Sequence, residues 1–135
     1  MNRKIRFRGK VKYNGNHKFS GDWVYGYYRN NDNGNAFITE TLDEYSNYIF
    51  DETEVDESTI GQFTGLIDKN GARIYEGDIV KGNFYGFPLP EYDYIFEIYW
   101  DKKEKGFMAS YFEASECEVI GNIYDNPELI EKEGK

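Results

Sequence analysis

Two carboxylates beside a tyrosine, in the run Tyr75-Glu76-Gly77-Asp78, have the residue types that general acid–base chemistry needs. In glycoside hydrolysis, however, the two carboxyl groups must converge on one bond from separate positions of the fold, and adjacency in sequence does not supply that. A glycine next to an acid is typical of a bulge or sharp corner between strands. We therefore expect Asp78 to accept backbone hydrogen bonds at a corner.

Other nucleophiles and bases are scarce. The single histidine, His17, directly follows the turn signal Asn14-Gly15-Asn16, and no serine or cysteine lies in a known nucleophile motif, so a catalytic triad has no support. The lone cysteine, Cys117, can form no internal disulfide and is expected to be a small half-buried side chain at the start of a strand. The sequence therefore predicts a protein that is not an enzyme and holds no cofactor.

Carboxylates crowd residues 43–57, around the apolar patch Tyr48, Ile49 and Phe50. Such density could hold a hard cation such as calcium, but the ligand spacing and central glycine of an EF-hand loop are missing. Solvated charge is the simplest interpretation. Two alternatives remain open, namely that the segment binds a metal or that it imitates the charge of DNA at a basic site on another protein.

The opposite charge gathers at the amino terminus. Six of the sixteen Lys and Arg residues lie in the first twelve positions, so removing this +6 from the formal charge of -9 leaves -15 for residues 13–135. We call four of these cations the basic strip; its members are Arg6, Arg8, Lys10 and Lys12. An acidic body is repelled by phosphate, which argues against broad contact with nucleic acid.

The basic strip also has the period of a β-strand. Its cations alternate with Phe7, Val11 and Tyr13, as a strand with one buried and one solvated face requires. The cations could be a solvated face that protects an edge strand, or they could bind an acidic partner, which could be the acidic surface of another copy. Nucleic acid is not excluded as the ligand of this strip.

A second candidate contact surface is the aromatic loop at residues 82–90, which carries two of the three prolines. Its rings, Phe84, Tyr85 and Phe87, either fold back over the core or form an exposed surface for a partner. These three residues and the basic strip are the candidate partner contacts that the sequence offers.

Strand-length segments separated by turn signals position these residues. The clearest turn is Asp68-Lys69-Asn70-Gly71, where Asn-Gly favours a tight hairpin. Gly26 could mark a bulge, and Asn126 and Pro127 fit the cap and first position of a short helix that Leu129 and Ile130 would hold against the sheet. The expected strands are residues 23–28, 36–41, 63–67, 72–75, 79–81, 92–100, 107–112 and 118–124, of which 92–100 is the longest.

Composition agrees with this pattern. The chain has 135 residues, the size of one ordinary domain, and its 19% aromatic content suits half-buried β surfaces. No apolar run reaches the length of a signal peptide or of a transmembrane helix, so we expect a cytosolic protein without membrane contact.

Four segments form a recognisable series along the chain: I-R-F-R-G-K at 5–10, W-V-Y-G-Y at 23–27, T-I-G-Q-F-T-G-L-I-D-K-N-G-A-R-I-Y-E-G-D-I-V at 59–80 and V-I-G-N-I-Y-D-N-P-E-L at 119–129. In this order they resemble the YopX family of phage and prophage proteins. The resemblance implies a small, mostly β protein made in the cytoplasm of a bacterial host. It brings no established activity, so the matching glycines and the Asn-Pro pair carry over only as backbone devices. The aromatic loop departs from the short aliphatic link that many members have.

We therefore expect a mainly β fold, with one or two small antiparallel barrels or a strongly bent sheet and a short C-terminal helix. Residues 1–130 would form one domain, or two small subdomains at about 1–58 and 59–130, with a frayed tail at 131–135. The favoured function is a non-catalytic phage accessory protein acting through protein contacts or self-association. A nucleic-acid-binding module using the basic strip is the alternative, and a carbohydrate-active hydrolase is the third hypothesis.

Overall fold

The computed structural model describes residues 6–15, 18–40, 51–82, 94–101, 106–107 and 114–131. Within them the protein is mainly β, with antiparallel sheets and one short helix near the C-terminal end, which confirms the fold class expected from the sequence. The chain divides into two compact units, residues 1–63 and 64–135, which we call the N-terminal and C-terminal units. The expected organisation, one domain at 1–130 or two subdomains at about 1–58 and 59–130, stays a prediction.

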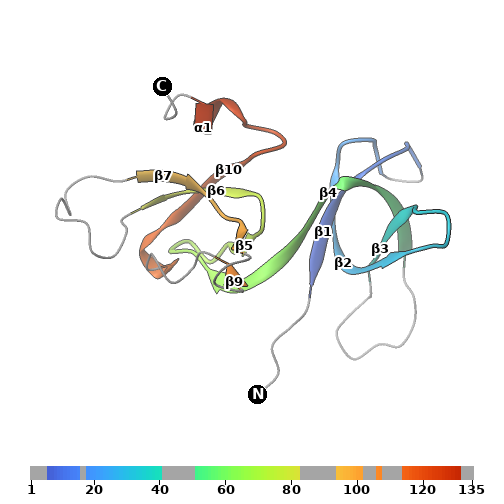
Figure 1. Ribbon diagram of the computed structural model, residues 1–135, viewed down its shortest axis with the longest axis horizontal. Coiled ribbons are helices and arrows are strands. Elements are labelled where there is room, and N and C mark those ends of the chain that lie inside the picture. Colours follow the sequence, from blue (N-terminus) through green and yellow to red (C-terminus); the bar gives the residue numbers. More distant parts are fainter. Residues whose placement is uncertain are drawn as a thin grey trace, which may run out of the picture. The chain divides into compact units, whose positions relative to one another are not determined.

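The strands of the N-terminal unit form a ring-like sheet. They are β1 (Phe7–Val11), β2 (Trp23–Asn30), β3 (Ala36–Glu40) and the first part of β4 (Asp51–Ile67). Each pairs antiparallel with the next, and β1 also pairs with β4, so the sheet closes on itself (Figure 1). The enclosed side chains form one buried cluster, made of Val11, Val24, Ala36, Ile38 and Val55.

The turn between β2 and β3 is made by asparagine and glycine, in the run 30–35 between two of the expected strands. The side-chain oxygen of Asn31 accepts hydrogen bonds from the amides of Asn33 and Asn35, both at 2.9 Å. Gly34 has a φ of 83°, a conformation that L side chains rarely adopt. The local chemistry of 31–35 therefore sets where β2 ends and β3 begins.

Gly26 does not form the bulge that its place in a strand suggested. The register of β1 on β2 is continuous from Phe7↔Gly26 to Lys10↔Trp23, and the pairing of β2 with β3 starts at the next residue, Tyr27. A Cβ at position 26 would lie 2.1 Å from the carbonyl oxygen of Thr39. Glycine is needed here because two backbones approach closely while β2 changes partners.

The acidic segment is in part a strand. Residues 43–50 lie outside the described residues, but 51–57 belong to β4, which is the longest strand in the part of the chain that the structure describes. The β-branched residues Thr53 and Val55 alternate with the acids, and Val55 is buried on the inner face. Glu52, Asp56 and Glu57 are exposed and Glu54 is half-buried, so these charges are solvated as expected, although the segment is a strand that also buries Val55.

The alternation expected for the first strand is only partly correct. Val11 is buried as predicted, but Tyr13 is 62% exposed because β1 ends at Val11. Arg8, expected on a solvated face, is only 5% exposed. The strand is also not an edge strand, since β2 and β4 pair with its two sides and leave a register shift between Arg8 and Lys10.

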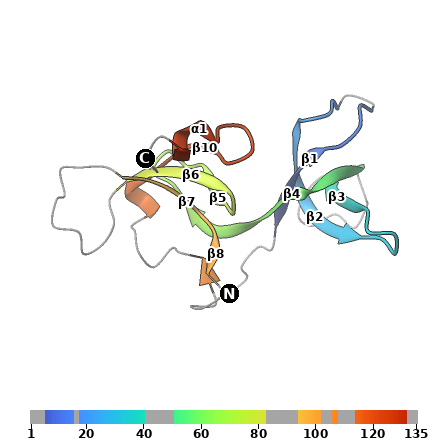
Figure 2. The same cartoon turned by 45° about the horizontal axis from the view of Figure 1, so that its top comes forward.

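The C-terminal unit contains shorter strands. They are β5 (Arg73–Tyr75), β6 (Asp78–Gly82), β7 (Tyr94–Glu97), β8 (Trp100–Asp101), β9 (Gly106–Phe107) and β10 (Glu118–Asn122), and a 3-10 turn at Ala114–Glu116 precedes β10. In the larger sheet, β6 lies between β10 and β7 (Figure 2). The buried cluster consists of Ile74, Val80, Phe96, Ile98 and Cys117. Cys117 is fully buried rather than half-buried, and a Cβ on Gly82 would meet its Sγ at 2.3 Å.

The hairpin predicted at 68–71 is present, and its first residue does more than start a turn. Gly71 has a φ of 86° and its amide donates to the carbonyl of Asp68. The buried Asp68 carboxylate accepts from the amides of Asn70, Ala72 and Val119, at 2.8 to 2.9 Å. The carboxylate thereby ties the hairpin to the start of β10.

The long strand predicted at 92–100 is wrong in its extent. The structure has β7 at Tyr94–Glu97, a break at Ile98, and the short β8, while residues 91–93 lie outside the described residues. Two hydrogen bonds continue the pairing past Glu97, from the amide of Gly77 to the carbonyl of Ile98 and from the amide of Ile98 to the carbonyl of Asp78. The pairing ends at Gly77, whose φ of 94° turns the chain. Of the strand expected at 107–112, the structure describes only Phe107, paired with Trp100.

The C-terminal helix, α1 (Glu128–Glu131), begins after Pro127 as expected. The Asn126 side chain does not cap it, however, because its oxygen accepts from the amide of Asn122 at 3.2 Å. Leu129 and Ile130 are half-buried, and α1 lies close to β7, so the helix is held against the sheet. No helix in the described residues is long and apolar enough to cross a membrane.

Candidate functional site

The candidate site is built on the outer face of β2. Successive side chains of a strand point to opposite faces, so Trp23, Tyr25 and Tyr27 face outward while Val24 is buried in the ring. We call these three rings the aromatic row. Tyr25 is 39% and Tyr27 is 53% exposed, whereas Trp23 is half-buried.

Two cations of the basic strip lie directly beside the aromatic row. The register of β1 on β2 places Arg8 opposite Tyr25 and Lys10 opposite Trp23. The guanidinium carbon of Arg8 is 4.5 Å from the centroid of the Trp23 ring, and Lys10 Nζ is 5.6 Å from it. Both distances fall within the range of cation–π attraction.

Stacking on Trp23 explains why Arg8 is buried. A guanidinium is planar and weakly hydrated, so it packs on an aromatic face more readily than an ammonium does. Arg8 therefore holds Trp23 in place. Arg6 and Lys10 are half-buried, and Lys12 is the exposed member of the basic strip, with a side chain that is 44% exposed. The alternation of the strip could not show this, because the tryptophan that covers Arg8 comes from another strand.

Acids flank the cations on the other side. β4 pairs with β1 so that Asp56 lies opposite Lys10, and Lys12 Nζ is 3.7 Å from Glu54 Oε2. The cations thus form a narrow line between the aromatic row and the acids of β4. Charge on this face changes from positive to negative within one strand spacing, roughly 5 Å.

Beyond the aromatic row, β2 continues into an ion pair. The Arg29 guanidinium donates two hydrogen bonds to the Glu52 carboxylate, one of them 3.0 Å long, and lies 4.6 Å from the Phe37 ring centroid. The hydrogen bond from Arg29 lowers the pKa of Glu52 and raises that of Arg29. These two side chains neutralise one another at the end of the row.

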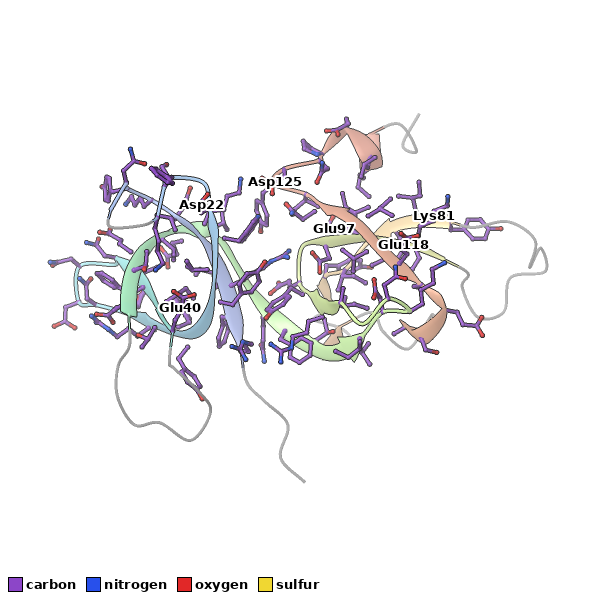
Figure 3. The ribbon with its side chains drawn as sticks, turned by 180° about the vertical axis from the view of Figure 1, so that it is seen from behind. Asp22, Glu40, Lys81, Glu97, Glu118 and Asp125 are labelled. Carbon is purple, nitrogen blue, oxygen red and sulfur yellow. The ribbon has the colours of Figure 1, made fainter. Side chains whose placement is uncertain are left out.

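At the corner 75–78, which could have supported acid–base catalysis, Asp78 has a structural role. Its carboxylate accepts from the amide of Tyr75 at 2.7 Å and is buried, which confirms the expected hydrogen bond. The neighbouring carboxyl of interest is Glu97 on β7 (Figure 3), whose pKa is raised first by burial and then by the charge of Glu76. This pairing joins residues 21 positions apart in the sequence, and nothing in the local pattern pointed to it.

Several predicted site residues cannot be placed. Phe84, Tyr85 and Phe87 of the aromatic loop lie outside the described residues, as does His17. Within the described ranges, no group of three His, Cys, Asp or Glu side chains could hold a metal ion. The loop contacts remain predictions, and the question of metal binding or DNA mimicry by 43–57 stays open.

The sequence did not single out the aromatic row as a set of contact residues. The signal was present, because aromatic residues at positions 23, 25 and 27 share one face of any regular strand. The sequence pattern did not show whether this face of the strand is exposed or buried, since an aromatic stripe of this kind more often faces the core. The burial of Val24 inside the ring settles which face is exposed.

A family model described as YopX protein matches residues 6–131, nearly the whole chain. No curated protein matches the sequence.

Proposed function

This chain belongs to the YopX family, and from that premise we propose that it is a non-catalytic accessory protein of a phage or prophage, acting through protein contacts in the bacterial cytoplasm. The contact is with a partner protein or with a second copy of the chain. The aromatic row is the observation that carries this proposal.

Neighbouring exposed aromatic side chains mark an interaction surface more often than a single exposed ring does. Tyr and Trp bury a large apolar area at low entropic cost and still offer a polar atom, so they are enriched in the centres of protein interfaces. In the N-terminal unit, Tyr25 and Tyr27 stand on a closed and well-packed ring, with Lys10 beside them. A rigid platform of this kind loses little conformational freedom when it binds.

A tagged protein recovered from induced lysogenic cells tests the proposal. We expect a protein partner in stoichiometric amount after nuclease treatment, or a solution mass that corresponds to more than one copy. A strictly monomeric mass together with no recovered partner would contradict the proposal. The measurement covers partners of every class, because the nuclease step separates proteins from nucleic acids.

Single-stranded nucleic acid is the second candidate ligand. Tyr25 and Tyr27 could stack on bases, and the basic strip could contact phosphates. Such binding would weaken steeply with salt and would be lost when Arg6, Lys10 and Lys12 are made neutral. The acids Glu54 and Asp56 next to the strip oppose it, so we rank it below protein contact. Absence of binding to (dT)20 or to a 20-base-pair duplex at low salt would remove it.

A further inference from the structure

Asparagine followed directly by glycine occurs three times in the chain, at Asn14, Asn33 and Asn70. This dipeptide can deamidate without a catalyst, because glycine has no side chain to hinder attack by its backbone nitrogen on the preceding side chain. All three pairs lie in connections between strands, and all three asparagines are exposed. The chemistry is independent of the proposed function, and the fold decides which pair reacts first.

The reaction joins the glycine nitrogen to Cγ of the asparagine side chain. The side-chain NH₂ group takes the proton of the glycine N–H and leaves as ammonia, so that a succinimide ring remains. Water then opens the ring at one of its two carbonyl groups. One product is aspartate and the other is isoaspartate, in which the main chain runs through Cβ. Water is the only co-reactant, and nothing is oxidised or reduced.

The glycine nitrogen can attack only when its N–H is released from the hydrogen bond that it makes in the folded chain. The amide of Gly34 donates to the carbonyl of Asn31 at 3.1 Å. The amide of Gly71 donates to the carbonyl of Asp68, also at 3.1 Å. The rate at each pair therefore depends on how readily its turn opens.

The turns 31–35 and 68–72 are built in the same way. In each, the side-chain oxygen of the first residue accepts from the amides two and four positions later, at 2.8 to 2.9 Å. In each, the amide of the first residue donates to the carbonyl of the fifth, and the glycine has a positive φ. The two turns are thus a matched pair that differs in the acceptor, a neutral amide at Asn31 and a carboxylate at Asp68.

The 68–72 turn is also held by residues outside it. The buried Asp68 carboxylate accepts from the amide of Val119 at 2.9 Å. The amide of Lys69 donates to the carbonyl of Cys117 at 2.9 Å. Among the described residues, the hydrogen bonds of the 31–35 turn join only positions of that turn. Because hydrogen bonds to a charged acceptor are roughly twice as strong as neutral ones, the 31–35 turn should open more readily.

At Asn14 both reacting groups are engaged. The side-chain oxygen of Asn14 accepts from the amide of Ser20 at 2.8 Å. The amide of Gly15 donates to the carbonyl of Lys18, also at 2.8 Å. The Asn33 side chain, by contrast, has no hydrogen-bond partner in the part of the chain that the structure describes. Attack at Asn14 therefore requires two contacts to break, and attack at Asn33 requires one.

We propose that Asn33 is the asparagine at which the folded protein deamidates first, and that isoaspartate at this position loosens the β2–β3 hairpin. Isoaspartate adds one backbone atom between the amides of residues 33 and 35, which both donate to the Asn31 oxygen. Both amides cannot then keep their places. The pair Asn30↔Ala36, the first of the β2–β3 ladder, lies directly beyond the turn.

Peptide mapping by tandem mass spectrometry tests the proposal on the folded full-length protein, incubated at pH 8 in ¹⁸O-labelled water. We expect conversion at Asn33 to be at least about threefold faster than at Asn14 or Asn70, with labelled oxygen in the new carboxyl group. Equal or slower conversion at Asn33 would overturn the proposal. In denaturant the three pairs should react at similar rates, because the turns are absent. The same order of rates in denaturant would also overturn it.

Exchanging the first residues of the two turns tests the reason for the order. Asn31→Asp should slow conversion at Asn33, and Asp68→Asn should speed conversion at Asn70, each by at least about twofold. Asn14 is the internal control, and its rate should stay within about twofold in both variants. Unchanged rates at Asn33 and Asn70 would contradict the role given to the acceptor.

Hydrogen exchange tests the effect on the hairpin. Asn33→Gln is the control, because the longer side chain would have to close a larger ring. After equal incubation, the amide of Ile38 on β3 should exchange faster in the wild type than in Asn33→Gln. Equal exchange in the two proteins would show that the hairpin tolerates isoaspartate and would overturn that part of the proposal.

Discussion

Gly26, Glu97 and Asp68 show how single residues carry constraints that come from distant parts of the chain. The carbonyl of Thr39 leaves no room for a side chain at Gly26. Burial and the charge of Glu76 raise the pKa of Glu97, and the amide of Val119 donates a hydrogen bond to the Asp68 carboxylate. In each case the neighbour lies more than ten positions away in the sequence. The effects of substitution at these positions can therefore be stated in advance.

Gly26→Ala should destabilise the protein by about 3 kcal/mol, because the added methyl would force apart two paired backbones. The clash is with a carbonyl oxygen, which cannot move as the end of a flexible side chain can. Urea unfolding measures the change. Gly15→Ala is the control, since no atom lies within 4 Å of its added Cβ, and we expect a change of no more than about 0.5 kcal/mol there. Similar losses in both variants would contradict the explanation.

Glu97→Gln should raise stability at neutral pH and leave it unchanged in acid. The folded pKa of Glu97 is raised, so between the unfolded and the folded pKa the folded state binds more protons, and stability falls as pH increases through that window. The neutral amide removes this loss. Melting temperatures from pH 4 to 8 are the measurement, and the exposed Glu116→Gln, which removes the same charge, serves as the control. A gain that is constant across pH would argue against burial and Glu76 as the cause.

Asp68→Asn should lower the free energy of unfolding by about 1 to 3 kcal/mol. Asparagine has one oxygen and one NH₂ group, so one backbone amide that donates to the Asp68 carboxylate would face another donor. Burial by itself would raise the pKa of Asp68, but the amides of Val119, Ala72 and Asn70 outweigh it and the pKa is lowered. The stabilisation is fully present above the unfolded pKa of about 3.9 and is lost as pH falls through the folded pKa. Denaturation curves should therefore show the gap between wild type and variant closing at low pH. A gap that persists at pH 2 would show that the ionised carboxylate is not responsible.

At the scale of elements, the connection from β10 to α1 shows why a short motif is built as it is. Asn122 uses its side-chain oxygen to accept from the amides of Tyr124 and Asp125, and its own amide donates to Asn126. A Cβ at Gly121 would lie 2.6 Å from the oxygen of Asn126. The glycine and the second asparagine of this motif thus fit one another.

Gly121→Ala should therefore be coupled to Asn126→Ala. Alone, Gly121→Ala should cost about 1 to 3 kcal/mol, because it displaces Asn126 from the Asn122 amide. In the background of Asn126→Ala the two nearest atoms are removed and the Cβ of residue 126, at 3.0 Å, remains, so the additional cost should fall by at least about 0.5 kcal/mol. A double-mutant cycle by chemical denaturation gives the coupling energy. Additive costs would mean that the two residues act independently.

At the scale of the whole molecule, the two compact units have separate buried clusters. Val55 belongs to the cluster inside the ring, and Val80 to the cluster of the C-terminal unit, and both side chains are at most 1% exposed. β4 is common to both units, since residues 51–63 fall in one and 64–67 in the other. The clusters share no residue, so we expect each to lose packing without the other.

Val55→Ala and Val80→Ala form a matched pair for testing this separation. Each should cost about 2 kcal/mol, because the same two methyl groups are removed from a close-packed environment. Native-state hydrogen exchange should show faster exchange at Val24 and Ile38 in the first variant and at Ile74 and Val119 in the second. Uniform loss of protection across the chain in both variants would show that the two units unfold together.

The sequence by itself determined the family, the mainly β fold, most of the turns and the hydrogen-bonding role of Asp78. These depend on local chemistry, since Asn31 to Gly34 or Asp68 to Gly71 dictate a turn whatever surrounds them. The sequence did not determine the extent of β4 or β7, because the end of a strand depends on where its partner turns away, as β6 does at Gly77.

Only the tertiary structure decided what the surface at β1 and β2 is. Alternation placed Arg8 and Lys10 on one face and Trp23, Tyr25 and Tyr27 on another, but the pairing register brought the two sets together. The same pairing buried Arg8 under an aromatic ring and placed acids beside the lysines. A contact surface is formed by neighbouring strands, and the residues of one strand do not specify which strand pairs with it.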